Sequence, residues 1–522
     1  MKLSPFWKGF VFVLIAALLA GGVVFISRVL AGDAFNREEA QHALYGMWLA
    51  RDIKALDIGS FWYDTQRQMV WPFLHSWVLS FFFLVFGTSY LTARLLSWAL
   101  FLAAVILIYL ISTELCDEKG WRVGIVASLL ALTSPIMIRF AAENMIEGLG
   151  ALLFMATAGL YMISEERKIT VEYVLLAFLI GLSIYTNYLY AYLLIPAFIV
   201  MTLVRLGPLT FEAVQLRRRG EKEAVHFVWW SYRKFIVLGV LLFLCGSWFS
   251  FSFSRKIFLL YNTIFKYSGG TVVEGWLPNL IYYPKVIISD LAFSPWIGVL
   301  MLAALFLPRV ASRYHGLNRL YIYVWTVLLL LTLTISAKTP QMIYIIVPFI
   351  LIIFSGVVVY LFDSLKRTNK AWAYGLAAVI LIPALISLPR FGGLYLPEQG
   401  EGSMIKALDY FQATVPGKAG IVSMLNLKRL NPEVVKFHFR DWPGEIIAET
   451  QFSGEEIPAG ETYFLSLEID ANSPYQADIL DDSLYRWNAW LKDREMDGRI
   501  RLYSVKRFDG PGLTAKIFRS NP

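Results

Sequence analysis

Residues 71–87 read WPFLHSWVLSFFFLVFG, and the placement of this apolar block decides the fold predicted for the chain. It is one of about a dozen apolar blocks before residue 390. If residues 72–86 span a membrane, every basic loop after them falls on the outer side, against the tendency of Lys and Arg to stay in the cytoplasm. The block contains His75 and has only about fifteen residues, whereas a spanning helix needs about twenty. We therefore predict a helix that lies along the outer membrane interface.

The remaining blocks predict a polytopic α-helical membrane protein with about eleven spanning helices, the N-terminus in the cytoplasm and the C-terminus outside. The first span, from Phe10 to Val29, is longer than the apolar core of a secretory signal, so we expect it to be retained. Five basic loops then fall on the cytoplasmic side. Their basic residues are Lys119/Arg122, Arg167/Lys168, Arg217 to Lys234, Arg309/Arg313/Arg319 and Lys366/Arg367/Lys370.

The composition agrees with a membrane protein. The 522 residues are 57% apolar and 16% charged, whereas soluble chains are about 45–50% apolar and about 25% charged. These values exclude a disordered chain, a coiled coil and a secreted disulfide scaffold. Since basic cytoplasmic loops account for the net charge of +8, we expect membrane lipids and no nucleic acid as partners.

A change in composition near residue 390 divides the chain into a membrane part, residues 1–389, and a C-terminal domain, residues 390–522. The latter is mixed polar, and its length suits a small α/β domain outside the cytoplasm. Strand patterns occur at 420–425, 434–439, 462–469, 499–505 and 514–518, and helical patterns at 403–413 and 475–491. Because the chain has no Asn-x-Ser/Thr site, a prokaryotic cytoplasmic membrane is favoured over a lumenal one.

The first outer loop contains the acidic sequence Asn36-Arg37-Glu38-Glu39-Ala40-Gln41-His42. Asn36 can cap a helix, with Glu39 reaching back as in a capping box, so a structural role competes with a catalytic one for Glu39. Glu38 projects in another direction, and His42 lies one turn further on the same face. Glu38 and His42 would hold either a metal ion or a substrate hydroxyl, and the spacing leaves both open.

The second outer loop carries Arg139, Glu143 and Glu147 between apolar segments. Ionisable groups at a membrane boundary indicate function, although carboxylates are also favoured where a helix begins. We expect carboxylates of the two loops to meet over one cleft, one acting as general base and the other positioning the acceptor or a metal.

Several cations of the predicted outer face run against the positive-inside trend. They are Arg255, Lys256, Lys266 and Lys338, and the aromatic residues Trp276, Tyr282 and Tyr283 belong to the same loops. Such cations favour an anionic partner, for which a phosphate is the natural candidate. Contact with lipid head groups is the simpler explanation for any single one of them.

In their order and membrane side, these features resemble the GT-C superfamily of membrane glycosyltransferases, in particular the branch of protein O-mannosyltransferases and aminoarabinose-to-lipid-A transferases. The resemblance rests on Glu38-Glu39-Ala40, Pro72 to Gly87, Ala93-Arg94, Ser134-Pro135 to Glu143, Pro278 with Tyr282-Tyr283, and Lys338-Thr339-Pro340. It runs through nearly the whole chain, although no single motif is specific. Glu38 and Glu143 stand where the family usually has Asp, and the lipid A branch's Lys before the Pro is absent, which argues against an aminoarabinose transferase.

The resemblance implies an enzyme that moves a sugar from a polyprenyl-phosphate carrier to an acceptor on the outer face, with inversion at the anomeric carbon. Glu38 would be the base, with Glu143 as its partner or alternative. The residues implied for the site are Glu38, Glu143 and Glu39 for catalysis, and His42, Arg255, Lys256, Lys266, Tyr282, Tyr283 and Lys338 for binding substrate. The sugar, the acceptor (a lipid, a glycan or a protein) and the need for a divalent metal stay open.

Two other hypotheses compete with the prediction of an enzyme. One is a transporter or lipid-handling protein without catalysis, and the other is an inactive GT-C-like subunit. Transporters place charges near the bilayer midplane and often have related halves, whereas this chain has no internal repeat and gathers its polar residues on one face. The Glu-for-Asp differences leave the inactive subunit open.

Overall fold

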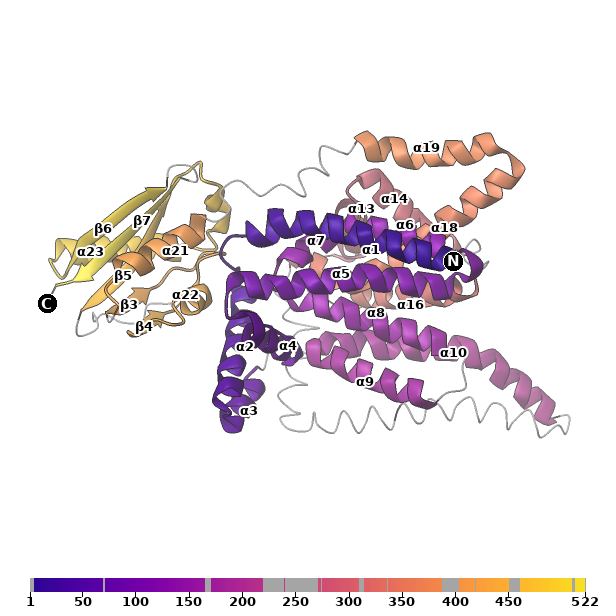
Figure 1. The fold of residues 1–522 in the computed structure, drawn as a ribbon, viewed down its shortest axis with the longest axis horizontal. Helices are drawn as coiled ribbons and strands as arrows, with labels where there is room; N and C mark the ends of the chain where they lie inside the picture. The colour runs from indigo at the N-terminus through magenta and orange to yellow at the C-terminus, as the bar shows by residue number, and fades with distance from the viewer. Residues whose placement is uncertain are drawn as a thin grey trace.

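The computed structural model describes residues 4–68, 71–164, 170–218, 239, 271–273, 275–308, 314–335, 337–386, 403–417, 419–449, 461–508 and 512–521. In these residues a bundle of helices is joined to a C-terminal α/β domain (Figure 1). The N-terminus lies at the end of the bundle away from that domain. The membrane part thus has two distinct ends, one of which faces the C-terminal domain.

The first half of the bundle contains α1 (Pro5–Val24), the π-helical η1 (Phe25–Leu30), α2 (Arg37–Ala55), α3 (Ile58–Gln66), α4 (Leu74–Phe86), α5 (Tyr90–Leu115), η2 (Asp117–Lys119), α6 (Gly120–Leu132), α7 (Pro135–Ala142), α8 (Ile146–Ser164), α9 (Thr170–Thr186) and α10 (Tyr188–Arg218). The second half contains β1 (Thr271–Val272), α13 (Trp276–Asp290), α14 (Pro295–Ala304), α16 (His315–Leu333), β2 (Ala337–Lys338), α17 (Pro340–Ile343), η4 (Tyr344–Ile346), α18 (Val347–Thr368) and α19 (Lys370–Ile386). β1 and β2 pair as a short antiparallel ribbon.

Five helices of the described part are long and apolar enough to cross a membrane. They are Pro5–Leu30, Tyr90–Leu115, Ile146–Ile163, Gly316–Leu333 and Pro340–Thr368. Two bent pairs raise the number to seven if each is one span: Gly120–Leu132 with Pro135–Ala142, and Tyr188–Val204 with Leu206–Leu216. The chain therefore has the helices of an integral membrane protein. Since part of the apolar sequence lies outside the described residues, about eleven spans stays a prediction.

The segment between α1 and α5, predicted to be the first outer loop, folds into α2, α3 and α4, and α2 and α3 lie at the end of the bundle nearer the C-terminal domain (Figure 1). α4 occupies the block that opened the sequence analysis, and its 13 residues are too few for a span. It packs on α2, and its residue Leu79 is buried at this contact. A Cβ at Gly46 would lie 2.9 Å from Leu79 Cγ, so the glycine permits this close approach of the two helices.

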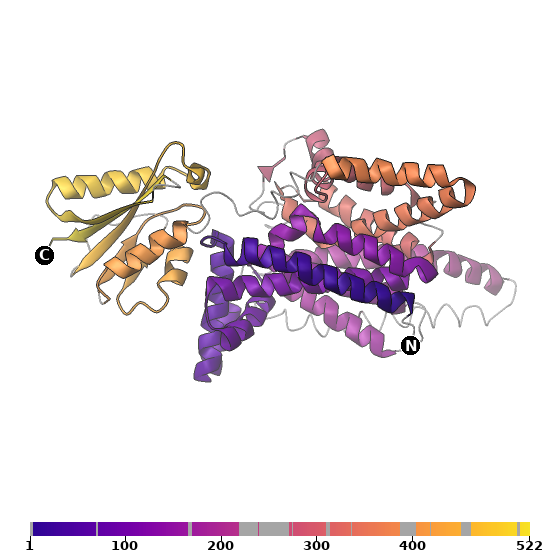
Figure 2. The ribbon, with the colours of Figure 1, turned by 45° about the horizontal axis from the view of Figure 1, so that its top comes forward.

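The C-terminal domain contains a five-stranded sheet in the order β4-β3-β5-β7-β6. Its elements are α21 (Ser403–Thr414), β3 (Gly420–Ser423), α22 (Pro432–His438), β4 (Ile446–Ala448), β5 (Thr462–Ile469), η5 (Pro474–Asp478), α23 (Ser483–Met496), β6 (Ile500–Phe508) and β7 (Leu513–Ser520). β3 is parallel to β4 and β5, whereas β7 is antiparallel to β5 and β6. α23 covers one face of the sheet, and α21 and α22 lie on the other (Figure 2).

Four of the five predicted strands are present, and the one at 434–439 is wrong because residues 434–438 lie in α22 and Phe439 is its C-cap. Asn431 caps that helix, its side chain accepting a hydrogen bond from Val434 N, and Pro432 occupies the first helical position. The β-branched pair Val434-Val435 favoured a strand locally, but capping and burial of both residues favour the helix.

The C-terminal domain packs directly against the first-loop helices. Phe35 meets Phe437 with ring centroids 5.2 Å apart, and Arg37 forms a 3.5 Å ion pair with Glu433 of α22. Asp33, 5% exposed, accepts hydrogen bonds from the Tyr475 hydroxyl at 2.6 Å and from Ile405 N at 3.2 Å. One apolar core is thus continuous from α2 and α4 into the C-terminal domain.

Candidate active site

A cavity of about 510 Å³ lies where the start of α2, the bundle and the C-terminal domain meet. Its lining residues come from segments far apart in sequence: Arg28, Gly32, Asp33, Ala34, Asn36, Glu39, Arg94, Pro135, Ile136, Ile138, Arg139, Ala142, Glu143, Asp290, Pro340, Lys428 and Arg429. Five of these side chains are cationic and four are carboxylic, so the lining has a formal charge of +1. A cavity of this size and charge suits a polar, anionic ligand.

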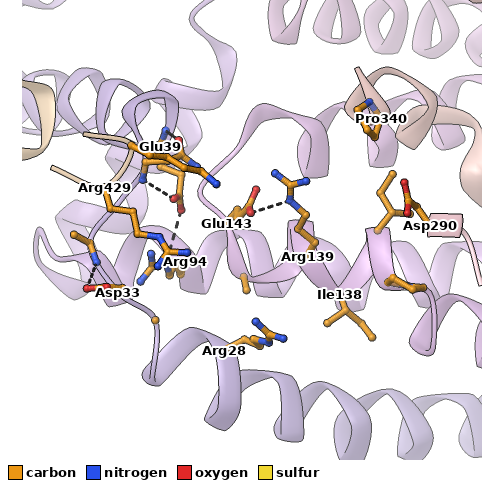
Figure 3. A pocket seen from close by; sticks show the side chains of 17 residues that line it. Arg28, Asp33, Glu39, Arg94, Ile138, Arg139, Glu143, Asp290, Pro340 and Arg429 are labelled. Carbon is orange, nitrogen blue, oxygen red and sulfur yellow. Dashed lines mark hydrogen bonds and ion pairs between the residues drawn. The ribbon is translucent and has the colours of Figure 1, made fainter. Parts of the chain in front are cut away.

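Glu39 lies at the centre of a hydrogen-bond network beside this cavity (Figure 3). The predicted capping box is present, since Glu39 N donates to Asn36 Oδ1 and Asn36 N donates to Glu39 Oε2, both at 3.0 Å. Glu39 Oε1 accepts from Asn144 N at 2.8 Å and lies 3.8 Å from Arg94 Nε. With both oxygens occupied and 3% exposure, this carboxylate positions the two loops rather than standing ready to accept a proton.

Glu143 is positioned differently from Glu39. It directly follows α7, and its Oε1 accepts a 2.9 Å hydrogen bond from Arg139 Nε one turn earlier (Figure 3). Its Oε2 is buried and has no hydrogen-bond partner among the described residues. Burial raises the pKa of Glu143 above the ordinary value of 4.5, while the Arg139 guanidinium lowers it. A cavity-lining carboxylate that has a raised pKa, and one oxygen without a hydrogen-bond partner among the described residues, has the properties of a general base.

Glu38 is half-buried next to this group, and no hydrogen bond to its carboxylate occurs within the described residues. Burial raises its pKa, and the negative charge of Glu143 raises it further, against the opposing effects of Arg139 and Arg37. The structure therefore brings Glu38 and Glu143 within electrostatic reach of each other, as the sequence predicted. The cavity lining includes Glu143 and not Glu38.

His42 does not reach the cavity. It is 2% exposed and packs against Trp71 and His75, with ring centroids 5.9 and 5.3 Å away. Burial, and then the neighbouring His75, lower the pKa of His42 well below its ordinary value, so the ring is neutral. Within the described ranges no group of three or more His, Cys, Asp or Glu side chains could hold a metal ion. Glu38 and His42 are therefore not joined there by a third ligand.

Lys338, Tyr282 and Tyr283 lie together but outside the cavity lining. The Lys338 ammonium donates hydrogen bonds to Leu331 O, Thr332 O and Ile335 O at 2.8–2.9 Å, at the C-terminal end of α16. It also lies 5.3 Å from the Tyr283 ring, and the Tyr282 hydroxyl donates to Lys338 O. Lys338 thus caps a helix C-terminus, which is a structural role, instead of facing the cavity as the sequence suggested.

The other three cations expected to bind phosphate, Arg255, Lys256 and Lys266, lie outside the described residues. The cavity lining instead includes three cations that were not predicted from the sequence, namely Arg28, Lys428 and Arg429. A signal existed for Arg28, since it is a charge at the predicted outer end of the first span. No sequence signal links Lys428 and Arg429 to a cavity in the membrane part, because only the docking of the C-terminal domain brings them there.

Part of the chain matches a known family. Residues 71–212 match the profile of the family described as dolichyl-phosphate-mannose-protein mannosyltransferase. No match was found among curated protein sequences. The matched segment contains α4, α5, α7, α8 and the loop with Glu143.

Solved structures resemble the chain over most or nearly all of its length. ArnT from Cupriavidus metallidurans bound to undecaprenyl phosphate is similar with a TM-score of 0.55 and 14% identity, covering 99% of both chains. Its apo form gives a TM-score of 0.56 at 12% identity over the same share. The Archaeoglobus fulgidus oligosaccharyltransferase in complex with Zn and sulfate gives 0.47 at 12% identity, covering 84% of this chain and 62% of its own. From the family match and the full-length likeness to ArnT, the resemblance to the GT-C superfamily of membrane glycosyltransferases is confirmed.

Proposed function

We propose that this chain is an integral-membrane glycosyltransferase that moves a sugar from a polyprenyl-phosphate donor to an acceptor on the outer face of the membrane, with inversion. The observation that carries the proposal is Glu143, a cavity-lining carboxylate with one vacant oxygen, beside Glu38 and several cations. A base and cations in one cavity supply what transfer from a sugar phosphate needs. Undecaprenyl phosphate bound to ArnT supports a lipid of this class as the carrier.

The reaction needs one proton acceptor and one anion-stabilising group. The acceptor hydroxyl attacks the anomeric carbon, its proton passes to the Glu143 carboxylate, and the bond from that carbon to the phosphate oxygen breaks, releasing polyprenyl phosphate. Attack from the side opposite the phosphate gives inversion. Burial, and then the charge of Glu39, raise the pKa of this base against the opposing effect of Arg139, and Arg139 and Arg28 of the membrane part stabilise the leaving phosphate. Glu39 holds the two loops so that these groups face one cavity.

The proposed membrane orientation has the N-terminus in the cytoplasm, about eleven spans, α4 along the outer interface, and the C-terminal domain outside. It is supported by Lys119 and Arg122, which both pair with Asp363 at 2.8–2.9 Å and so bring two of the predicted cytoplasmic loops together. The N-terminus and the C-terminal domain also lie at opposite ends of the bundle (Figure 1). The cavity then opens toward the outer face.

The test measures transfer of labelled sugar from a polyprenyl-phosphate donor in membranes that contain the full chain. Glu143→Gln is expected to reduce transfer by about 10²–10⁴-fold, as loss of a general base does, and Glu38→Gln by less. Glu495→Gln, an exposed carboxylate on α23, serves as the matched control and should transfer like the wild type. Unchanged transfer by Glu143→Gln would refute the assignment of the base, and a wild type that binds the lipid but transfers nothing would favour a lipid-handling protein.

A further inference from the structure

The loop between β3 and α22 carries Lys428 and Arg429 into the lining of the cavity. All other lining residues belong to the membrane part, from Arg28 to Pro340. The candidate site is therefore composite, and the C-terminal domain contributes only positive charge to it. This contribution is not needed to explain the proton transfer proposed for Glu143.

The loop is held in place on both sides. Lys428 N donates to Asp478 O at 2.8 Å, and the Asn431 side chain donates to Lys428 O at 3.2 Å. Asp33 in turn joins this domain to the membrane part through Tyr475. Because these contacts fix the loop backbone, the two cationic side chains reach the cavity from a defined position rather than from a loose surface segment.

Within the described residues, some cationic side chains of the cavity lining form ion pairs with carboxylates, and that of Lys428 does not. Arg94 pairs with Glu39 and Arg139 pairs with Glu143, whereas the Lys428 ammonium has no ion pair or hydrogen bond with any residue the structure describes. Its charge is near enough to Glu143 to lower the pKa of that carboxyl. The neighbouring Arg429 lies 3.8 Å from Asp478, and its side chain points to the Arg94 side of the cavity (Figure 3). An unmatched cation facing a cavity requires an anion to complete it.

We propose that Lys428 and Arg429 form an anion site that binds a phosphate group of a substrate. This inference rests on the proposed function. The phosphate is either that of the polyprenyl donor or one carried by the acceptor, and in both cases the C-terminal domain is part of the substrate site. The reaction would then depend on how that domain is docked, although none of its residues accepts the proton.

The experiment compares the full-length double variant Lys428→Ala/Arg429→Ala with the wild type and with Lys436→Ala, an exposed lysine of α22 outside the cavity lining. Two quantities are measured: the affinity of the purified protein for undecaprenyl phosphate, and the transfer of labelled sugar in membranes at saturating donor. The thermal midpoint of each variant shows whether it is folded. If the thermal midpoint of the double variant falls, the conservative double variant Lys428→Gln/Arg429→Gln is measured in its place.

Loss of a charge-assisted contact predicts a change of at least about tenfold. If the phosphate belongs to the donor, affinity for undecaprenyl phosphate falls by this factor. If it belongs to the acceptor, that affinity is unchanged and transfer falls instead. The inference is overturned if both quantities match the wild type, or if Lys436→Ala loses as much. A wild type without any transfer overturns the proposed function, and this inference with it. An active wild type whose double variant matches it in both quantities overturns this inference alone.

Discussion

The Glu39 carboxylate accepts a 2.8 Å hydrogen bond from the backbone N–H of Asn144, 105 residues further along the chain. The Asn144 side chain returns a second hydrogen bond, of 3.0 Å, to Glu39 O. The start of α2 and the loop before α8 are thereby joined through two residues. This junction sets Glu38 beside Glu143, so the geometry of the proposed base depends on a neighbouring carboxylate that takes no part in proton transfer.

Glu39→Ala should destabilise the protein much more than Glu38→Ala. The first change leaves the buried N–H groups of Asn36 and Asn144 without their acceptor, at a cost of about 1–3 kcal/mol for each unsatisfied group. The second removes a carboxylate that no hydrogen bond holds in the described part of the chain. The thermal midpoints of the two purified variants in the same detergent check this difference. Equal midpoints would show that the Glu39 network contributes nothing to stability.

The transfer rate should fall on acidification with a midpoint above pH 4.5. Burial raises the pKa of Glu143 above that ordinary value, and a general base must be ionised to act. Arg139 and Lys428 both lower this pKa, Arg139 by more. Arg139→Gln should therefore move the acidic limb of kcat/KM to higher pH, and Lys428→Gln should move it less in the same direction. A shift to lower pH in either variant contradicts Glu143 as the base.

Removal of the Tyr475 hydroxyl should loosen the docking of the C-terminal domain. Tyr475→Phe deprives Asp33 of its 2.6 Å hydrogen bond, and hydrogen bonds to charged groups are worth about 1.5–3 kcal/mol. Hydrogen exchange should then increase at Ile405 N, which also donates to Asp33 from the C-terminal domain. A double-mutant cycle with Asp33→Ala measures the coupling, since the two losses should not add. Additive losses would mean that the pair does not hold the domain.

Lys338→Met should lower stability without weakening the binding of undecaprenyl phosphate. The change removes three hydrogen bonds to the carbonyls that end α16 and leaves those groups unpaired. Lys285→Met, an exposed lysine on α13, gives the comparison. Thermal midpoints and lipid affinity are measured on the same preparations. A loss of affinity at an unchanged midpoint would restore the phosphate role that the sequence suggested for Lys338.

Features that depend on neighbours in sequence could be predicted well. The capping box joins Asn36 and Glu39, three residues apart, so its pattern is visible in the sequence itself. The strand at 462–469 was predicted at its observed bounds because alternation and composition are local signals. The expectation that Glu38 and Glu143 lie close together was drawn from a membrane sidedness predicted from charge patterning, and in the structure Glu143 is near enough to raise the pKa of Glu38.

Features that depend on tertiary packing could not be predicted. Lys338 carries the same charge whether it faces a phosphate or three carbonyls, and only the tertiary fold, which sets it beside the carbonyls at the end of α16, decides between them. In the sequence, Lys428 and Arg429 are indistinguishable from surface charges of a polar domain. Only the contact of Asp33 with Tyr475 of that domain shows that they lie at the cavity. The helix α22 was missed since Val434 and Val435 favour a strand locally, whereas the cap at Asn431 outweighs that preference.

The apolar core shared by α2, α4 and the C-terminal domain cannot form until the whole of that domain has been synthesised. Asp33 and its partner Ile405 are 372 residues apart, and a ribosome adding roughly 5–20 residues per second takes about 20–75 s to cover that distance. During this interval α2 and α4 have been made, but the residues that bury their outward apolar side chains have not. The completed cavity therefore forms only after the C-terminal domain has been made and has packed against α2 and α4.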